Sequence, residues 1–176
     1  MFAHIPSWCP VLAGLLYCFL LNPIQAGEVR VKHGDGHEEI YVDDQIPKTQ
    51  DLVRILGSTR GIKPSSLALK IQFKVGSAEL TSAAKEQLQP LGEALQSAEL
   101  QSRSYIIEGH TDRSGQLSRN MVLSKKRAES VRQYLTQNFT IESSQLAAAG
   151  LGPNQPLDHA DPFNPINRRV TFTAAQ

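Results

Sequence analysis

The sequence predicts an α/β fold in which helices cover one face of a mixed sheet. Residues 67–73 and 168–174 alternate apolar and polar side chains, as half-buried strands do. The stretch "TSAAKEQLQPLGEAL" and residues 118–137 instead place apolar residues at helical spacing. The patterns follow one another as strand, helix, strand, helix, strand, loop and strand, without a repeat or low-complexity run. We therefore expect a β-α-β-α-β-(loop or short helix)-β sandwich.

The first 26 residues contain no Lys, Arg, Asp or Glu, and residues 11–21 form an apolar run. As a helix this run would be roughly 16 Å long, too short for the ~30 Å hydrocarbon core of a membrane. The small residues Ala26 and Gly27 follow it. We predict a secretory signal peptide over residues 1–26, cleaved after Ala26, with an uncleaved membrane-associated anchor as the alternative.

Both cysteines, Cys9 and Cys18, lie in this predicted signal peptide. The predicted mature chain can therefore form neither a disulfide nor a thiolate site. The net charge of +1 belongs to the mature part, because the first 26 residues carry no charged side chain of these four types. Such a small charge argues against a protein that is driven onto nucleic acid by its overall charge.

Residues 27–66 are expected to form an N-terminal arm of a hairpin, a short helix and a loop. Two short alternating runs surround "HGDG", a composition that suits a surface hairpin, and "TQDLVRILG" suits one or two helical turns ending at Gly57. The arm is too small for a core of its own, and it is a possible contact for an envelope protein partner. His33, Asp35 and His37 could be metal ligands, but the turn explains them and we expect no metal.

The remaining residues, 67–176, are expected to form one domain that begins with a half-buried strand. The alternating apolar residues of that strand are Leu67, Leu69, Ile71 and Phe73. The helix that follows has apolar residues at helical spacing, at positions Ala84, Leu88, Leu91 and Leu95. Thr81 or Ser82 can cap its N-terminus, and Pro90 should kink or split it.

In the second half of this domain, predicted strands and a predicted helix again follow one another. "SYIIEGH" predicts a strand, and residues 118–137 predict a helix. The buried side of that helix is expected to carry Leu123, Ala128, Val131 and Leu135. "QLAAAG" suits a third strand, and "RRVTFTA" suits a fourth with Val170 and Phe172 on one face.

The segment "EGHTDRSG" and the helix after it carry the candidate site. A strand ending there delivers Thr111 and Asp112 to a loop, and Gly115 lets the chain turn before the helix. Asn120 and Arg127 are two turns apart and share a face about 10 Å along the helix axis. We expect Asp112 to face the same groove.

Simpler interpretations of these residues are open at this point. Asp112 could cap the helix, and Arg127 could lie on a solvated, charged face near Glu129. The region is locally basic, which suits an anionic wall polymer, a nucleic acid or lipid headgroups; its cations are Arg113, Arg119, Lys125, Lys126, Arg127 and Arg132. No aromatic residues are interleaved with them, so we expect no nucleic acid.

A hydrolase would use residue types such as Ser77, His110 and Asp112. No Gly-x-Ser-x-Gly turn surrounds any serine, and His110 has no His-Glu-x-x-His partner. We therefore expect no catalytic residue, no metal and no cofactor, and we take His110 as a structural residue of the turn. The chain also lacks the run of alternating lipid-facing strands that a membrane barrel needs.

"GHTDRSG" followed by "N..LS..RA..V", "G.GP..P" and "NP.NRRV" resembles the OmpA C-terminal-like family of peptidoglycan-binding domains, which includes Pal and MotB. The resemblance runs from about Leu67 to Phe172. It implies non-covalent binding of peptidoglycan through the diaminopimelate of the stem peptide. It also implies a periplasmic protein of a diderm bacterium, associated with the cell wall or the outer membrane.

The resemblance assigns roles to four residues. The free end of diaminopimelate is a zwitterion, and Asp112 matches the carboxylate that holds its ammonium. Arg127 matches the guanidinium that holds its carboxylate, for which two-pronged donation is better than the point charge of a lysine. Asn120 and Arg168 match positions that add hydrogen bonds. Thr111 is expected to be a supporting contact because it is next to Asp112.

One segment departs from the family pattern. Where the family often has an acidic or amide residue, "FKVGSAEL" has Lys74, Val75 and Gly76, so a polar ligand contact is either missing or supplied by the backbone. The alternative function is an interaction subunit of an envelope machine, such as a stator or a secretion assembly, in which wall binding is secondary.

Overall fold

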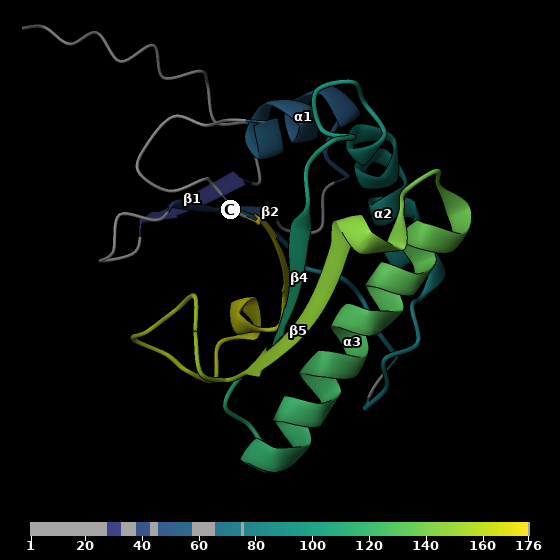
Figure 1. Cartoon of the computed structure of the whole chain (residues 1–176). Helices are drawn as coiled ribbons and strands as arrows, with labels where there is room; N and C mark the ends of the chain where they lie inside the picture. Colours follow the sequence, from purple (N-terminus) through teal and green to yellow (C-terminus); the bar gives the residue numbers. More distant parts are fainter. Residues whose placement is uncertain (1–27, 33–37, 43–45, 58–65, 75, 176) are drawn as a thin grey trace, which may run out of the picture.

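The computed structural model describes residues 28–32, 38–42, 46–57, 66–74 and 76–175 (Figure 1). Within them one six-stranded sheet has the strand order β1-β2-β3-β6-β4-β5. The elements are β1 (Glu28–Lys32), β2 (Glu38–Val42), α1 (Thr49–Gly57), β3 (Ser66–Leu69), α2 (Ser82–Leu95), β4 (Tyr105–His110), α3 (Leu117–Asn138), η1 (Ser143–Gln145), β5 (Leu146–Gly152), η2 (Pro165–Asn167) and β6 (Val170–Ala174). The predicted signal peptide and the turn with His33, Asp35 and His37 lie outside the described residues.

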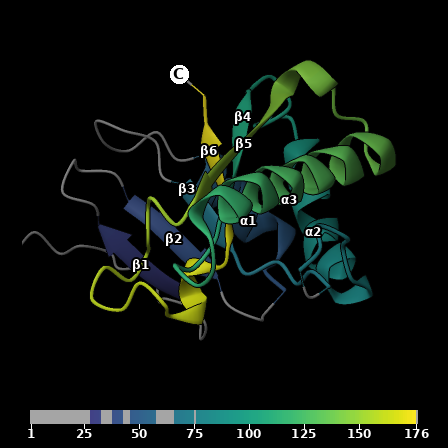
Figure 2. The same cartoon turned by 90° about the horizontal axis from the view of Figure 1, so that it is seen from below.

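The last strand, β6, lies between β3 and β4 and runs antiparallel to both. β4 pairs with β5 in parallel, and β2 pairs with β3 in parallel, so the sheet is mixed as the sequence predicts. Figure 1 shows α2 and α3 on one side of β4 and β5, with the loop that follows β5 on the other side. Figure 2 shows the helices layered against the strands from a second direction.

The main core fills the space between the sheet and the helices. Phe172 of β6 and Ile107 of β4 are fully buried there, as are Val131 and Leu135 of α3. In the described part of the chain, no helix combines the length and the apolar character needed to cross a membrane.

The segment ahead of residue 67 contributes to the same core. β1 and β2 lie antiparallel, and α1 places Leu52, Ile55 and Leu56 in the core. The sequence suggests a surface hairpin, but Ile40 of β2 is only 3% exposed, because β2 also pairs with β3. Parallel neighbours need a crossover connection, and α1 lies in the connection between β2 and β3.

β3 is shorter and more buried than the alternating pattern predicts. Its ladder ends at Leu69, and all four of its residues are buried. Ala68, expected on the exposed face, is covered by a second small apolar cluster with Tyr41, Leu157 and Ile166. Leu157 lies in the loop after β5 and Ile166 lies in η2, and period-two alternation within one strand cannot show such contacts.

α2 begins as the sequence predicts, since the side chain of Thr81 accepts a hydrogen bond of 3.2 Å from the backbone N–H of Ala84. Its buried apolar residues include all those predicted: Ala84, Leu88, Leu91 and Leu95. Pro90 lies inside the helix without splitting it, so that the helix continues to Leu95.

α3 packs closely on the sheet because glycines face it. A Cβ on Gly109 would lie only 2.1 Å from the backbone oxygen of Ser124, and one on Gly150 would lie 2.4 Å from the backbone nitrogen of Lys125. Ser124 is fully buried at this contact, and its Oγ accepts a 3.0 Å hydrogen bond from the N–H of Gly152. The prediction of Leu123 as a buried residue is therefore wrong by one position, since Leu123 is only half-buried.

Candidate functional site

The loop between β4 and α3 carries the first part of the site. Thr111 and Asp112 are only 4% and 6% exposed. The N–H of Thr111 donates to the carbonyl oxygen of Gly152 at 3.0 Å, which fastens the loop to the end of β5. Gly115 adopts φ 81°, a left-handed conformation that favours glycine, and so allows the turn that the sequence predicts.

The carboxylate of Asp112 has a partner on each oxygen. Oδ1 accepts from the backbone N–H of Ser114 at 3.0 Å and also from the hydroxyl of Ser114. Oδ2 accepts from Nη1 of Arg168 at 2.6 Å, which is an ion pair. The N-cap of α3 is Gln116, so Asp112 does not cap this helix.

The contacts of Asp112 keep it ionised. Burial raises the pKa of its carboxyl, but the hydrogen bonds from Ser114 and Arg168 outweigh burial and leave the pKa below its ordinary value. The site therefore holds a fixed negative charge at neutral pH.

Asn120, in the first turn of α3, closes the loop over Asp112. Its Nδ2 donates to the carbonyl oxygen of Ser114 at 2.7 Å and to that of Asp112 at 3.3 Å. The amide nitrogen of Asn120 is thus used to brace the loop.

Arg127 lies two turns further along α3, against the segment after β3. Its guanidinium carbon is 4.8 Å from the centre of the Phe73 ring, and its Nε donates to the carbonyl oxygen of Ser77 at 3.2 Å. Within the described residues, its Nη1 and Nη2 have no hydrogen-bond partner. The outer edge of the guanidinium can therefore donate to a ligand.

The charges of Arg127, Arg168 and Asp112 act on one another. Burial lowers the pKa of Arg127, the positive charge of Arg168 lowers it further, and the negative charge of Asp112 raises it. Arg127 is not on the solvated face near Glu129, whose carboxylate pairs with Lys125 and Arg132 instead.

Three of the five candidate residues line two separate hollows: Asn120 lines one, and Arg127 and Arg168 line the other. A hollow of about 250 Å³, which we call the arginine hollow, is lined by Lys70, Ile71, Gln72, Phe73, His110, Arg127, Pro165, Arg168 and Arg169. A second hollow of about 520 Å³, the proline hollow, is lined by Arg113, Gly115, Leu117, Asn120, Pro153, Asn154, Pro156, His159 and Pro162. Asp112 links them, because Arg168 bonds its carboxylate and Asn120 bonds its backbone. Neither Asp112 nor Thr111 is itself a lining residue of either hollow.

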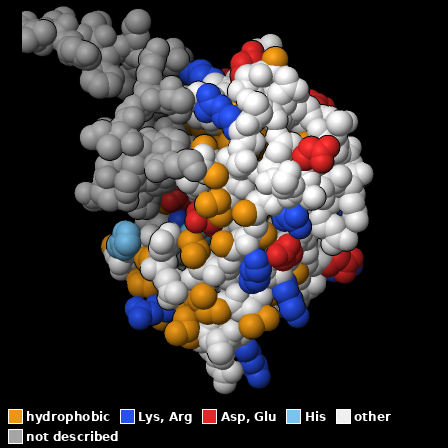
Figure 3. All heavy atoms as spheres, in the orientation of Figure 1, with side chains coloured by type: hydrophobic (Ala, Val, Ile, Leu, Met, Phe, Trp, Pro, Cys, Tyr) orange, Lys and Arg blue, Asp and Glu red, His pale blue; other side chains and the backbone are white. Residues whose placement is uncertain are grey.

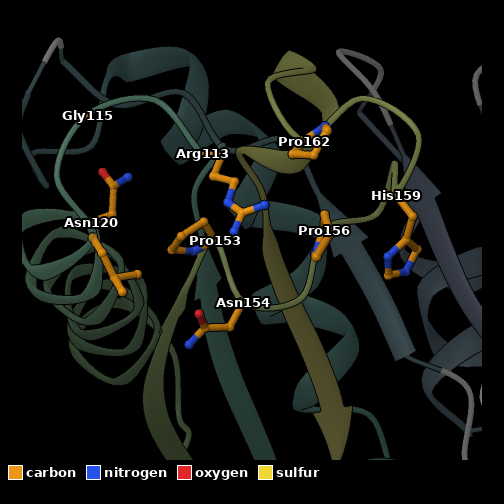
Figure 4. Close-up of a pocket in the computed structure, with 9 residues that line it drawn as sticks. Arg113, Gly115, Asn120, Pro153, Asn154, Pro156, His159 and Pro162 are labelled. Atoms are coloured by element: carbon orange, nitrogen blue, oxygen red, sulfur yellow. The ribbon is translucent and has the colours of Figure 1, made fainter.

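The proline hollow lies between the start of α3 and the loop after β5, and Figure 4 shows Arg113 extending between Pro153 and Pro162. Apolar side chains are exposed on these elements, with Leu117 58% and Phe163 61% accessible. Figure 3 shows hydrophobic side chains gathered over this face, with Lys and Arg side chains around them.

The structure adds residues to the candidate site that sequence reasoning missed. Ser114 bonds Asp112, and the spacing Asp-x-Ser of an Asx turn could have indicated it. Phe73, predicted only as a strand residue, lies under Arg127. Lys74, in the segment that departs from the family pattern, pairs with Glu79 at 2.5 Å.

Among the described residues, no group of three His, Cys, Asp or Glu side chains could hold a metal ion.

Comparison with known proteins places this site in a family. A sequence model of the OmpA family matches residues 72–169. "Outer membrane porin F" of Pseudomonas aeruginosa is 39% identical over 71 residues, which are 39% of this chain and 20% of the porin. "Peptidoglycan-associated lipoprotein" of Buchnera aphidicola is 33% identical over 67 residues, 38% of each chain. The chain thus spans well under half the length of these relatives.

Solved structures share the fold. The cell wall anchor of the T6SS from Pseudomonas aeruginosa superposes with a TM-score of 0.54, covering 75% of this chain and 100% of that one. The two sequences are 19% identical, so this likeness shows the fold alone.

Proposed function

The chain belongs to the OmpA family, and from that premise we propose that it binds peptidoglycan non-covalently through the diaminopimelate of the stem peptide. One relative is named a peptidoglycan-associated lipoprotein, and a structure of the same fold is named a cell wall anchor. We further propose that the protein resides in the periplasm, at the cell wall or the outer membrane. Binding without catalysis would anchor or locate it there.

The observation that carries this proposal is one carboxylate beside two arginines. Asp112 is ionised and bonded to Arg168, whose side chain is 48% exposed, and Arg127 presents two nitrogens without partners in the described residues. The free end of diaminopimelate carries an ammonium and a carboxylate on one carbon. Its ammonium would bind Asp112 together with Arg168. Its carboxylate would accept hydrogen bonds from Arg127 and draw the side chain of Arg168 outward.

The proposed affinity of one site is modest. Hydrogen bonds between charged groups contribute about 1.5–3 kcal/mol each, and the lost freedom of the bound ligand offsets much of their sum. Because peptidoglycan repeats the same stem peptide many times, attachment of several copies would be stronger than attachment of one.

Sedimentation with purified sacculi tests the proposal. We expect the chain from residue 27 onward to sediment with sacculi, and Asp112→Ala and Arg127→Ala to stay in the supernatant. Lys126→Ala is the matched control, because Lys126 is an exposed cation next to Arg127. Equal retention of both site variants would show that the pocket is misassigned.

The alternative, an interaction subunit of an envelope machine, predicts a different result. In that case the chain would not sediment with sacculi by itself, and it would be retained only through a protein partner. The segment of residues 27–66 is the proposed contact for such a partner.

A further inference from the structure

A buried ion pair joins Glu39 of β2 to Arg169, the residue just before β6. Nε of Arg169 donates to Oε1 of Glu39 at 2.5 Å, and Nη2 donates to Oε2 at 3.1 Å. The two side chains are 2% and 4% exposed, so the pair lies out of water. Thr171 adds a hydrogen bond of 3.1 Å from its hydroxyl to Oε1 of Glu39.

Glu39 reaches this partner from two strands away. It lies on β2, which pairs with β3, and β3 in turn pairs with β6. Tyr41, Ala68 and Thr171 are aligned across these three strands, and Glu39 shares the face of Tyr41 because side chains alternate along a strand. Residue 39 precedes the part of the chain that the family model matches, residues 72–169.

Arg169 connects this pair to the candidate site in three ways. Arg168, which bonds Asp112, is its neighbour in the chain. The carbonyl oxygen of Arg169 accepts a hydrogen bond of 2.9 Å from the N–H of His110, which lies two residues before Asp112. Its Nη1 donates to the carbonyl oxygen of Gln155 at 3.3 Å, in the loop after β5. A shift of Arg169 would therefore move both partners of the ion pair between Arg168 and Asp112.

We propose that Glu39 is a positioning residue, which holds Arg168 in place through Arg169 without touching the ligand. A buried guanidinium that loses its carboxylate partner is costly, because its charge stays away from water. Without Glu39, Arg169 would move toward solvent or another acceptor, and the start of β6 would follow it. The consequence for affinity rests on the proposed binding of peptidoglycan, whereas the consequence for the position of Arg168 does not.

Glu39→Gln tests the proposal with two measurements. The first is the nitrogen NMR signal of the Arg168 side chain, identified by its loss in Arg168→Lys, in the chain without ligand. The second is the affinity for a stem peptide that ends in diaminopimelate. We expect the Arg168 signal to shift, and the affinity to fall about tenfold, the equivalent of one charge-assisted hydrogen bond.

Two further variants separate positioning from stability. Glu39→Met with Arg169→Met replaces the pair by apolar side chains, a change that often preserves stability. We expect it to unfold near the wild-type temperature and still show the shifted Arg168 signal and the lower affinity. Leu135→Ala, in the core near the end of α3, is expected to unfold at a lower temperature but to keep the wild-type signal and affinity where it is folded.

An unchanged Arg168 signal in folded Glu39→Gln would overturn the proposal, as would wild-type affinity in that variant. A wild-type chain that does not bind the stem peptide would contradict the proposed function alone. The signal of Arg168 would then still decide whether Glu39 positions it.

Discussion

Asp112 and Arg168 are 56 positions apart in the sequence, yet their 2.6 Å contact is one of the hydrogen bonds that lower the pKa of the Asp112 carboxyl. The carboxylate is buried, a condition that alone would favour its neutral form. Ser114 and Arg168 together reverse this effect and keep the pKa low. The same hydrogen bonds aim the carboxylate, so a ligand ammonium would meet an anion already in place.

Arg168→Ala should raise the pKa of Asp112, because it removes a hydrogen bond and a positive charge while burial remains. A lowered folded-state pKa gives stability that is present above the unfolded-state value of about 3.9 and is lost as pH falls through the folded-state value. In the variant the stability contribution of Asp112 should therefore be smaller, and its loss should be complete at a higher pH than in the wild type. NMR titration of the Asp112 carboxyl and urea unfolding across the acid range measure both effects.

Lys126→Ala is the control for this titration, since Lys126 is exposed and absent from the contacts of Asp112. An Asp112 midpoint that stays constant or falls in Arg168→Ala would contradict the assigned ion pair.

The sequence indicated which residue types gather at the site, but not what each one contacts. Spacing placed Asn120 and Arg127 on one helix face, and the family resemblance added Arg168. The structure shows that the amide nitrogen of Asn120 bonds two loop carbonyls and that Phe73 lies under Arg127. These contacts depend on how the loop after β4 and the segment after β3 fold back onto α3. The spacing of residues within one segment does not predict this. The ligand roles of the residues remain predictions.

At the scale of single elements, α3 shows both the strength and the limit of periodicity. The pattern gave the helix and three of its four buried residues, Ala128, Val131 and Leu135. The pattern predicted Leu123 rather than Ser124 as the buried residue, because the pattern depends on hydrophobicity alone. The glycines of β4 and β5 allow the helix backbone to come so close that a small hydroxyl side chain fits there better than leucine.

Gly109→Ala should destabilise the protein by pushing α3 away from β4. The new Cβ would lie 2.1 Å from a backbone oxygen that has little freedom to move. We expect a loss of about 1–3 kcal/mol in the free energy of unfolding, the usual range for overpacking. Gly57→Ala is the control, because its Cβ would be at an ordinary 3.6 Å from Leu100. Equal stability of the two variants in urea would contradict the close packing.

At the scale of the whole molecule, the order of the strands in the sheet could not be predicted from local sequence patterns. The strand and helix patterns predicted a mixed α/β sandwich, which the structure confirms. They did not show that β6 enters the middle of the sheet, or that β2 pairs with β3 and places Glu39 beside Arg169. Both are contacts between distant parts of the chain.

Removal of residues 1–65 should destabilise the rest of the chain. It would expose the core now covered by Leu52, Ile55 and Leu56, each of which contributes about 1.5–3 kcal/mol through burial. It would also leave Arg169 without Glu39. Thermal unfolding followed by circular dichroism should show a lower midpoint than in a chain that begins at residue 28. Equal midpoints would contradict the shared core.

The most direct test of the central claim compares two stem peptides, one ending in diaminopimelate and one ending in lysine. The two differ at the side-chain terminus, where lysine lacks the carboxylate proposed to bind Arg127 and Arg168. Titration of the chain from residue 27 onward, followed by NMR, should show binding of the diaminopimelate peptide with shifts at Asp112 and Arg127. We expect the lysine peptide to bind at least about tenfold more weakly. Equal binding of the two peptides, or shifts confined to residues away from both Asp112 and the arginine hollow, would contradict the claim.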